Sequence, residues 1–207
     1  MPTLHGYLAT SPAFFVEVVS AVYRPAVDDD DPESASEVST TRPDVAVNGH
    51  HLLSSWQAAP GRIADGIDGE ALRAWIEPVR DLLTQQRRLE VGLTIVGQVL
   101  AFAPVDSDGI WPSVAVRDLI EELADENLDE GVVIGLFNRR GATVRNPAAG
   151  GTQETSLAQT YLEGSESLAD RWPRTAAMLR TVADGYDRDA RRQEERAERF
   201  RRGHRLA

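Results

Sequence analysis

Hydrophobic residues recur at helical spacing along most of this chain. Near the start, Phe15, Val18 and Val22 follow Ser11 and Pro12, which are typical of a helix N-cap and first turn, and Pro25 ends the pattern. The same spacing of i, i+3, i+4 and i+7 predicts further helices later in the chain. These cover about 43–57, a stretch introduced by Gly66 and Asp68, about 90–103, a stretch after Pro112, about 152–170 and about 172–201.

Two stretches conflict with a simple helical pattern. Pro78 falls inside the third predicted helix, and we expect it to kink or break that helix. The segment 125–137 is ambiguous because residues 132–134 are β-branched, whereas the spacing of Leu128 and Leu136 suits a helix. Since the neighbouring segments are all helical, we predict a helix there.

The pattern as a whole predicts an all-α fold, either an irregular helical bundle or a short helical-repeat, α-solenoid-like array. Residues 26–42 are rich in Asp and Ser and poor in apolar residues, which predicts a disordered acidic linker. This linker would separate an N-terminal helical segment, 1–25, from a helical domain, 43–207. The apolar seam of the last helix weakens after Tyr186, so we expect a basic C-terminal helix that projects from the domain.

The composition excludes several kinds of chemistry. The 207 residues include no Cys and no Lys, which rules out thiolate metal sites, disulfides and lysine-based catalysis. His50 and His51 are adjacent and would point about 100° apart on a helix, so they form a poor metal pair. We therefore predict no catalytic residue, no metal ligand and no cofactor, and a protein that is not an enzyme. Without a transmembrane stretch or signal peptide, we expect a cytoplasmic location.

Charge is unevenly distributed over the chain. The net charge of −11 disfavours contact of the whole molecule with nucleic acid or with an anionic membrane. Residues 104–137 have a net charge of −8, whereas 138–151 and 186–207 each have a net charge of +3. This segregation predicts an acidic middle and a basic tail.

The acidic stretch supplies one set of candidate partner-binding residues. Carboxylates at i, i+3, i+4 and i+7 would share one face of a helix, and they are Glu122, Asp125, Glu126 and Asp129. Such a face is a solvated outer face, a docking surface for a basic partner or, least in keeping with the spacing, a catalytic pair. We take Glu122, Asp125 and Asp129 as candidates for binding a partner.

Arginines supply the second set. Arg139, Arg140 and Arg145 lie in a loop with glycines, where arginine forks suit an anion, a salt bridge or solvent. Arg192 and Arg199 represent the basic tail, in which acids at i, i+4 favour an ordinary charged helix over nucleic-acid contact. These five arginines are candidate partner-binding residues.

Several phrases resemble a known group of sequences. They are Trp111-Pro112 with residues 115–122, Gly135 to Asn138, residues 170–176 and residues 186–192. Together they resemble the C-terminal helical region of large uncharacterised bacterial multidomain proteins of actinobacterial type. The resemblance implies no catalytic residues, and it implies that the chain corresponds to the end of a larger protein. The long Asp-rich linker departs from that group.

These observations favour a non-catalytic protein-interaction or scaffold module of a larger bacterial protein or complex. Its surface would be built from helices near 113–137, the 138–151 loop and the basic tail. The alternative is a nucleic-acid-associated regulator of a defence or toxin–antitoxin type that uses the arginine loop and tail. We expect a protein partner first, nucleic acid second and no membrane. An enzyme with a carboxylate-bound metal is the third hypothesis.

Overall fold

The computed structural model describes residues 4–26, 43–139 and 150–204. The described residues form nine α-helices and one short antiparallel hairpin, which confirms the all-α prediction. The predicted linker, 26–42, lies outside the described residues except for Ala26. The elements are α1 Leu4–Thr10, α2 Pro12–Val22, α3 Pro43–Ser54, β1 Arg62–Ile63, β2 Gly66–Ile67, α4 Gly69–Gln85, α5 Leu89–Leu100, α6 Val114–Leu123, α7 Glu126–Arg139, α8 Thr152–Leu168 and α9 Pro173–His204.

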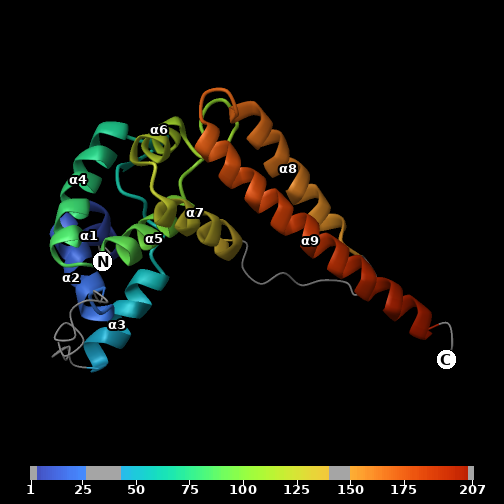
Figure 1. Cartoon of the computed structure of the whole chain (residues 1–207), viewed down its shortest axis with the longest axis horizontal. Coiled ribbons are helices and arrows are strands. Elements are labelled where there is room, and N and C mark those ends of the chain that lie inside the picture. The colour runs from blue at the N-terminus through green and yellow to red at the C-terminus, as the bar shows by residue number, and fades with distance from the viewer. Residues whose placement is uncertain (1–3, 27–42, 140–149, 205–207) are drawn as a thin grey trace.

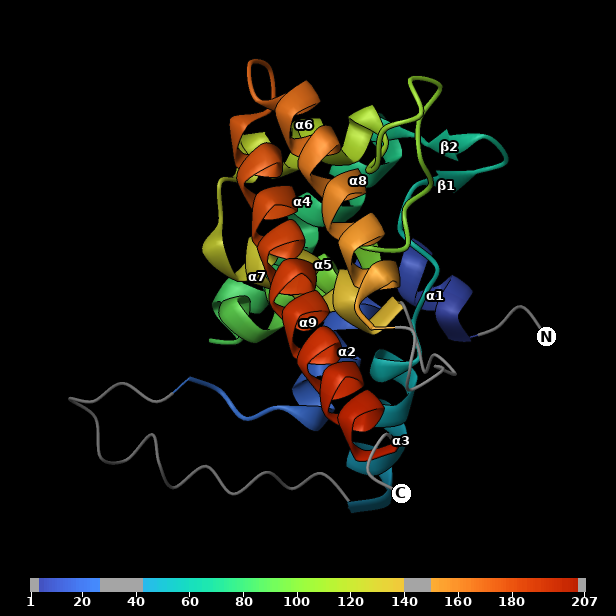
Figure 2. The same cartoon turned by 90° about the vertical axis from the view of Figure 1, so that its right-hand side faces the viewer.

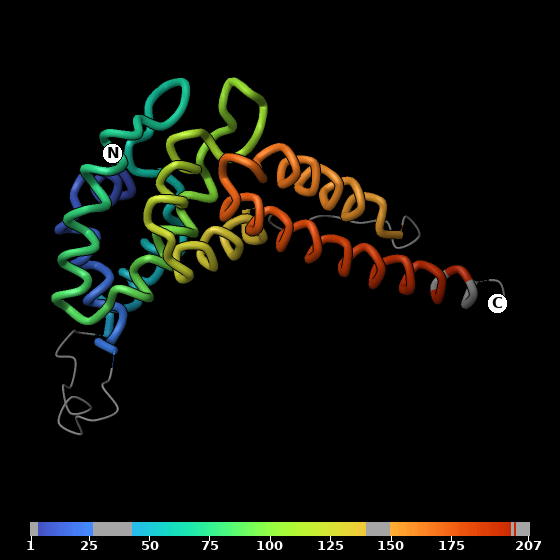
Figure 3. Tube along the Cα trace, turned by 45° about the horizontal axis from the view of Figure 1, so that its top comes forward, coloured from blue at the N-terminus to red at the C-terminus, as the bar shows by residue number. Residues whose placement is uncertain are grey.

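The helices are arranged in layers that follow chain order. Helices α1 to α4 form one end, α5 to α7 form the middle, and α8 with α9 forms a hairpin that extends from the other end (Figure 1). Seen from that end, α8 and α9 lie side by side (Figure 2). The chain trace therefore follows a shallow arch (Figure 3). Of the two architectures expected, this order is closer to the short helical array.

Local sequence signals explain where several helices begin. The amide of Phe14 donates to Ser11 Oγ at 3.3 Å, and Pro12 occupies the first position of α2, as the sequence predicts. The Asp68 carboxylate accepts hydrogen bonds from the amides of Glu70 and Ala71, which caps α4. Each cap satisfies amides that have no partner inside the helix.

Of the two effects expected at Pro78, a kink or a break, the break does not occur, because helix α4 continues through the proline. Proline has no amide hydrogen, so the hydrogen bond to the carbonyl of Ala74 is lost. Ala74 is an exposed residue, so water can bond to this carbonyl instead. On the opposite side, Leu72, Val79 and Leu83 are fully buried. Their burial along the whole helix offsets the cost of the proline.

Other boundaries differ from the sequence-based ranges by a few residues, and three elements were not predicted. The helix expected over 43–57 ends at Ser54, and the ambiguous segment 125–137 is helical, as predicted. Helix α1 and the two-stranded hairpin are too short to show a period in the sequence.

The N-terminal helical segment shares one core with the helices that follow it. The ring of Phe15 in α2 lies 5.4 Å from that of Trp56 and 5.3 Å from that of Trp75 in α4, measured between ring centroids. The Trp75 indole Nε1 also donates to the carbonyl of Leu8 at 3.0 Å. These contacts hold α1 and α2 against α3 and α4.

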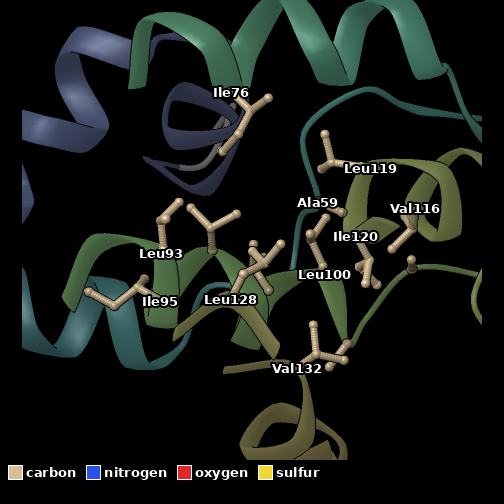
Figure 4. Packing of buried hydrophobic residues seen from close by; sticks show 14 of the residues in the cluster. Ala59, Ile76, Leu93, Ile95, Leu100, Val116, Leu119, Ile120, Leu128 and Val132 are labelled. Atoms are coloured by element: carbon tan, nitrogen blue, oxygen red, sulfur yellow. The ribbon is translucent and has the colours of Figure 1, made fainter. Parts of the chain in front are cut away.

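The middle layer is held by an unusually close approach of α5 and α7. A Cβ atom at Gly97 would lie 2.2 Å from the carbonyl oxygen of Leu128, and one at Gly131 would lie 2.1 Å from that of Thr94. Only glycine permits backbones to meet at this distance. Around this contact, side chains from α4, α5, α6 and α7 converge in the core (Figure 4).

The α5–α7 contact gives a first prediction. Gly131→Ala forces the two helices apart and should lower the free energy of unfolding by about 1–3 kcal/mol, as overpacking does. Gly6→Ala is the control, because a Cβ there meets nothing within 4 Å. Chemical denaturation of both variants measures the difference. Equal stability of the two variants would contradict the close approach.

Candidate interaction surface

The acidic residues predicted to share one helix face belong to two helices. Helix α6 ends at Leu123, and Ala124 adopts a left-handed conformation with φ of 47° before α7 begins. The Asp125 carboxylate then accepts hydrogen bonds from the amides of Asn127 and Leu128, at 2.9 and 3.3 Å. Asp125 therefore caps α7 and is not part of a continuous acidic face.

Glu122 and Asp129 are also bonded within the chain. Glu122 forms an ion pair with Arg73 of α4, at 2.9 Å between carboxylate oxygen and Nε, and this contact raises the pKa of the arginine. Asp129 forms an ion pair with Arg174 of α9, at 2.6 Å. Glu122 and Asp129 thus connect different helices of this chain, whereas Asp125 caps α7.

The start of α9 is held by carboxylates of α6. Glu121 accepts hydrogen bonds from the backbone amides of Arg174 and Thr175, at 3.1 and 2.8 Å, and from the Thr175 hydroxyl at 3.0 Å. Asp118 accepts one from the Trp172 indole at 2.7 Å. A carboxylate at a helix N-terminus accepts hydrogen bonds from the free amides and is attracted by the positive end of the helix dipole. We call these contacts, together with the Asp129–Arg174 pair, the carboxylate joint.

Asp129 is the perturbed group of this joint. Its side chain is only 18% exposed, and burial raises its pKa from 3.8 to about 6, although Arg174 acts in the opposite direction. The negative charges of Asp125 and Glu121 raise the pKa further. The folded protein therefore binds a proton at Asp129 more tightly than the unfolded chain does.

A buried arginine that sequence analysis did not single out stabilises the same region. Arg117 is fully buried, and its Nε donates to the carbonyl of Pro112 at 2.6 Å. Its guanidinium also pairs with Asp108 at 2.7 Å, donates to the carbonyl of Ile110 and lies 4.9 Å from the centroid of the Trp172 ring. This pairing lowers the pKa of Asp108. The sequence signal was a lone arginine beside the apolar positions of α6.

Arg139 contacts its own chain, and Arg140 and Arg145 lie outside the described residues. The Arg139 guanidinium donates to the carbonyl of Ala101 at 2.9 Å and lies 5.8 Å from the centroid of the Trp111 ring. It also lies beside Tyr161, whose pKa burial raises and this arginine partly lowers. Arg139 therefore links the end of α7 to α5, to the loop before α6 and to α8.

The tail arginines are on the exposed side of α9. Arg192 pairs with Asp189, and Arg199 with Glu195 at 3.5 Å. Helices α8 and α9 extend together from the body as a hairpin (Figure 1). Between them, the rings of Tyr161 and Tyr186 are stacked with centroids 5.7 Å apart. The outer face thus combines both charges in local pairs, which contribute little to stability when exposed.

A surface that sequence analysis missed lies at the other end of the arch. Residues 4–22 and 43–61, which contain α1, α2 and α3, have only two carboxylates and no arginine, and the two are Glu17 and Asp44. Most large hydrophobic side chains that are exposed in the described residues are on these helices, and they are Leu4, Tyr7, Val45 and Val47. We call this surface the uncharged end. Depletion of charge with exposed aromatic and aliphatic residues is typical of protein interfaces.

Two hollows flank α1 at the uncharged end. One is a groove of about 330 Å³ between α1, α2 and α3, and its apolar lining is Leu4, Phe14, Val18, Ala21, Val45 and Leu52. The other is a hollow of about 620 Å³ between α1, the hairpin and α4, lined largely by small residues. The signal for this surface was the missing charge, which could have been counted in the sequence.

Among the described residues, no three His, Asp or Glu side chains are grouped so that they could hold a metal ion. His50 and His51 are both exposed on α3. None of the helices in the described ranges has the length and apolar character needed to cross a membrane.

The carboxylate joint predicts an unusual dependence on pH. Because the pKa of Asp129 is raised to about 6, protonation of this group stabilises the fold as pH falls from about 7 to 4. Asp129→Asn cannot titrate, so its Tm relative to wild type should be higher at pH 7.5 than at pH 4.5. Thermal melts at both values measure this, with Asp170→Asn as an exposed control. A constant difference between wild type and Asp129→Asn would contradict the raised pKa.

Comparison with known proteins finds none that is significantly similar to this chain. No protein-family model matches the chain, and no significant match is found among curated proteins or solved structures. The resemblance to the C-terminal region of large actinobacterial-type proteins therefore stays a prediction.

Proposed function

We propose that this chain is a non-catalytic protein-interaction or scaffold module of a larger cytoplasmic bacterial protein or complex. The observation that carries this proposal is the uncharged end formed by α1, α2 and α3. On a chain with a net charge of −11, a surface with two carboxylates and several exposed hydrophobic side chains is a marked exception. Such an exposed apolar surface suits a protein partner.

The candidate residues from the acidic stretch and from Arg139 are used inside the molecule. They connect α4, α6, α7, α8 and α9, so they keep the arch in shape. A rigid framework favours binding because less conformational freedom is lost on association. We therefore place the partner surface at the uncharged end and give the charged residues a supporting role.

The alternative function, nucleic-acid binding through the basic tail, draws less support. The tail arginines compete with acids on their own helix, as the Arg192–Asp189 and Arg199–Glu195 pairs illustrate. Those pairs would have to be given up for contacts to phosphates. Nucleic-acid binding would also show a steep loss of affinity as salt rises.

A pull-down with matched variants tests the proposal. Val47 is 56% exposed at the uncharged end, and Val105 is 55% exposed outside it, so Val47→Asp and Val105→Asp introduce the same charge at equal exposure. We expect nuclease-treated host lysate to yield a partner with wild type and Val105→Asp, and at least fivefold less with Val47→Asp. Equal recovery with all three proteins would refute the uncharged end as the binding surface.

A further inference from the structure

We propose that the groove between α2 and α3 binds a basic amphipathic helix of a partner protein. This inference rests on the proposed function and adds the chemistry of the partner. It combines three observations: the shape of the groove, its apolar lining and the charges at its border.

The groove has two helical walls of matching length. On α2, Phe14, Val18 and Ala21 are spaced i, i+4 and i+7, and on α3, Val45 and Leu52 are seven residues apart. Seven residues of helix rise about 10 Å, so each wall extends about two turns. A third helix packs well over the seam between two such helices, with side chains inserted at i, i+3, i+4 and i+7.

Helices α2 and α3 approach each other closely at Gly49, which lines the groove. A Cβ at Gly49 would lie 2.7 Å from the Cγ2 atom of Val22 and 3.5 Å from the Cγ1 atom of Val18. Glycine at this position therefore lets the two helices meet at the floor of the groove. The phenyl ring of Phe14 is held from the side by Tyr7, with ring centroids 6.3 Å apart.

The ionised side chains on α2 and α3 are both acidic. Glu17 is exposed and lines the groove, and Asp44 precedes Val45 at the start of α3. In the sequence, the segment that connects α2 to α3, residues 23–42, contains two arginines and six acids, and the acids are Asp28, Asp29, Asp30, Asp31, Glu33 and Glu37. An apolar floor with an acidic border complements a helix that has an apolar stripe flanked by Lys or Arg.

The same charges disfavour a second copy of this chain as the occupant. A symmetric pair would place equivalent acids on both sides of the contact, and each copy has a net charge of −11. A basic helix, in contrast, would be attracted by the whole molecule as well as by the border of the groove.

A pair of synthetic peptides tests this inference on the full chain. Both are labelled 18-residue peptides with leucines at i, i+3, i+4 and i+7, and the remaining positions are Lys in one and Glu in the other. By fluorescence anisotropy at low salt, we expect the Lys peptide to bind wild type at least tenfold more tightly than the Glu peptide. Rising salt should reduce this difference, because the border charges become screened.

Matched variants show whether the peptide occupies the groove. Val45→Asp should lower the affinity for the Lys peptide at least tenfold, because it places a charge in the apolar groove. In a purely electrostatic contact, the added acid would instead raise this affinity. Val105→Asp adds the same charge elsewhere and should change the affinity less than twofold. Leu4→Asp alters another wall of the groove at a residue that is 57% exposed, and circular dichroism checks that each variant folds.

Three results would overturn the inference. The first is that Val45→Asp and Leu4→Asp leave the affinity for the Lys peptide unchanged. The second is that the Glu peptide binds as tightly as the Lys peptide, and the third is that neither peptide binds. If neither peptide binds and sedimentation shows a wild-type dimer that Val45→Asp dissociates, the occupant is a second copy. If the peptides fail but Val47→Asp still abolishes partner capture, the interaction function stands and only the basic helix is refuted.

Discussion

The backbone contact between α5 and α7 is the constraint on which the rest of this structure depends. Where Gly97 and Gly131 face the opposite helix, no side chain separates the two backbones, and the pair becomes a compact middle layer. The apolar face of α4 and α6 packs on this layer at one side, and α9 packs on α7 at the other. A side chain at either glycine would push α5 and α7 apart, so the close spacing of these two helices depends on the missing Cβ atoms.

Polar groups complete what this apolar contact begins. The α8–α9 hairpin meets the middle layer through the carboxylate joint, where Glu121 caps α9 and Asp129 pairs with Arg174. Arg117 closes the adjacent loop by pairing with Asp108 and packing against the Trp172 ring. Because buried charges are costly unless they are paired, each of these groups requires a particular position of its partner. The joint therefore defines where the hairpin sits, at some cost to stability from the buried Asp129.

This use of charge inside the molecule changes the view of its function. Residues that look like a binding surface in the sequence, such as Glu122, Asp129 and Arg139, are bonded to other elements of the same chain. The surface left for a partner is instead the uncharged end, which the arch holds away from the basic tail (Figure 1). Hydrophobic side chains exposed at an end of a helical array are a natural place for another helix to pack.

The sequence by itself determined the helical class and the helix starts at Ser11 and Asp68, because spacing and capping are local properties, whereas the local pattern of 125–137 left both strand and helix open. It did not determine that Pro78 would be tolerated, since only packing of α4 on both sides of the proline offsets the lost hydrogen bond. Tertiary structure also decided the roles of the charges: Asp129 and Arg139 bond to partners far away in the chain, and Arg117 packs against the ring of Trp172. From the sequence alone, a charged residue on a helix is expected to be solvated. Only the assembled fold shows where a neighbouring element excludes water from that residue.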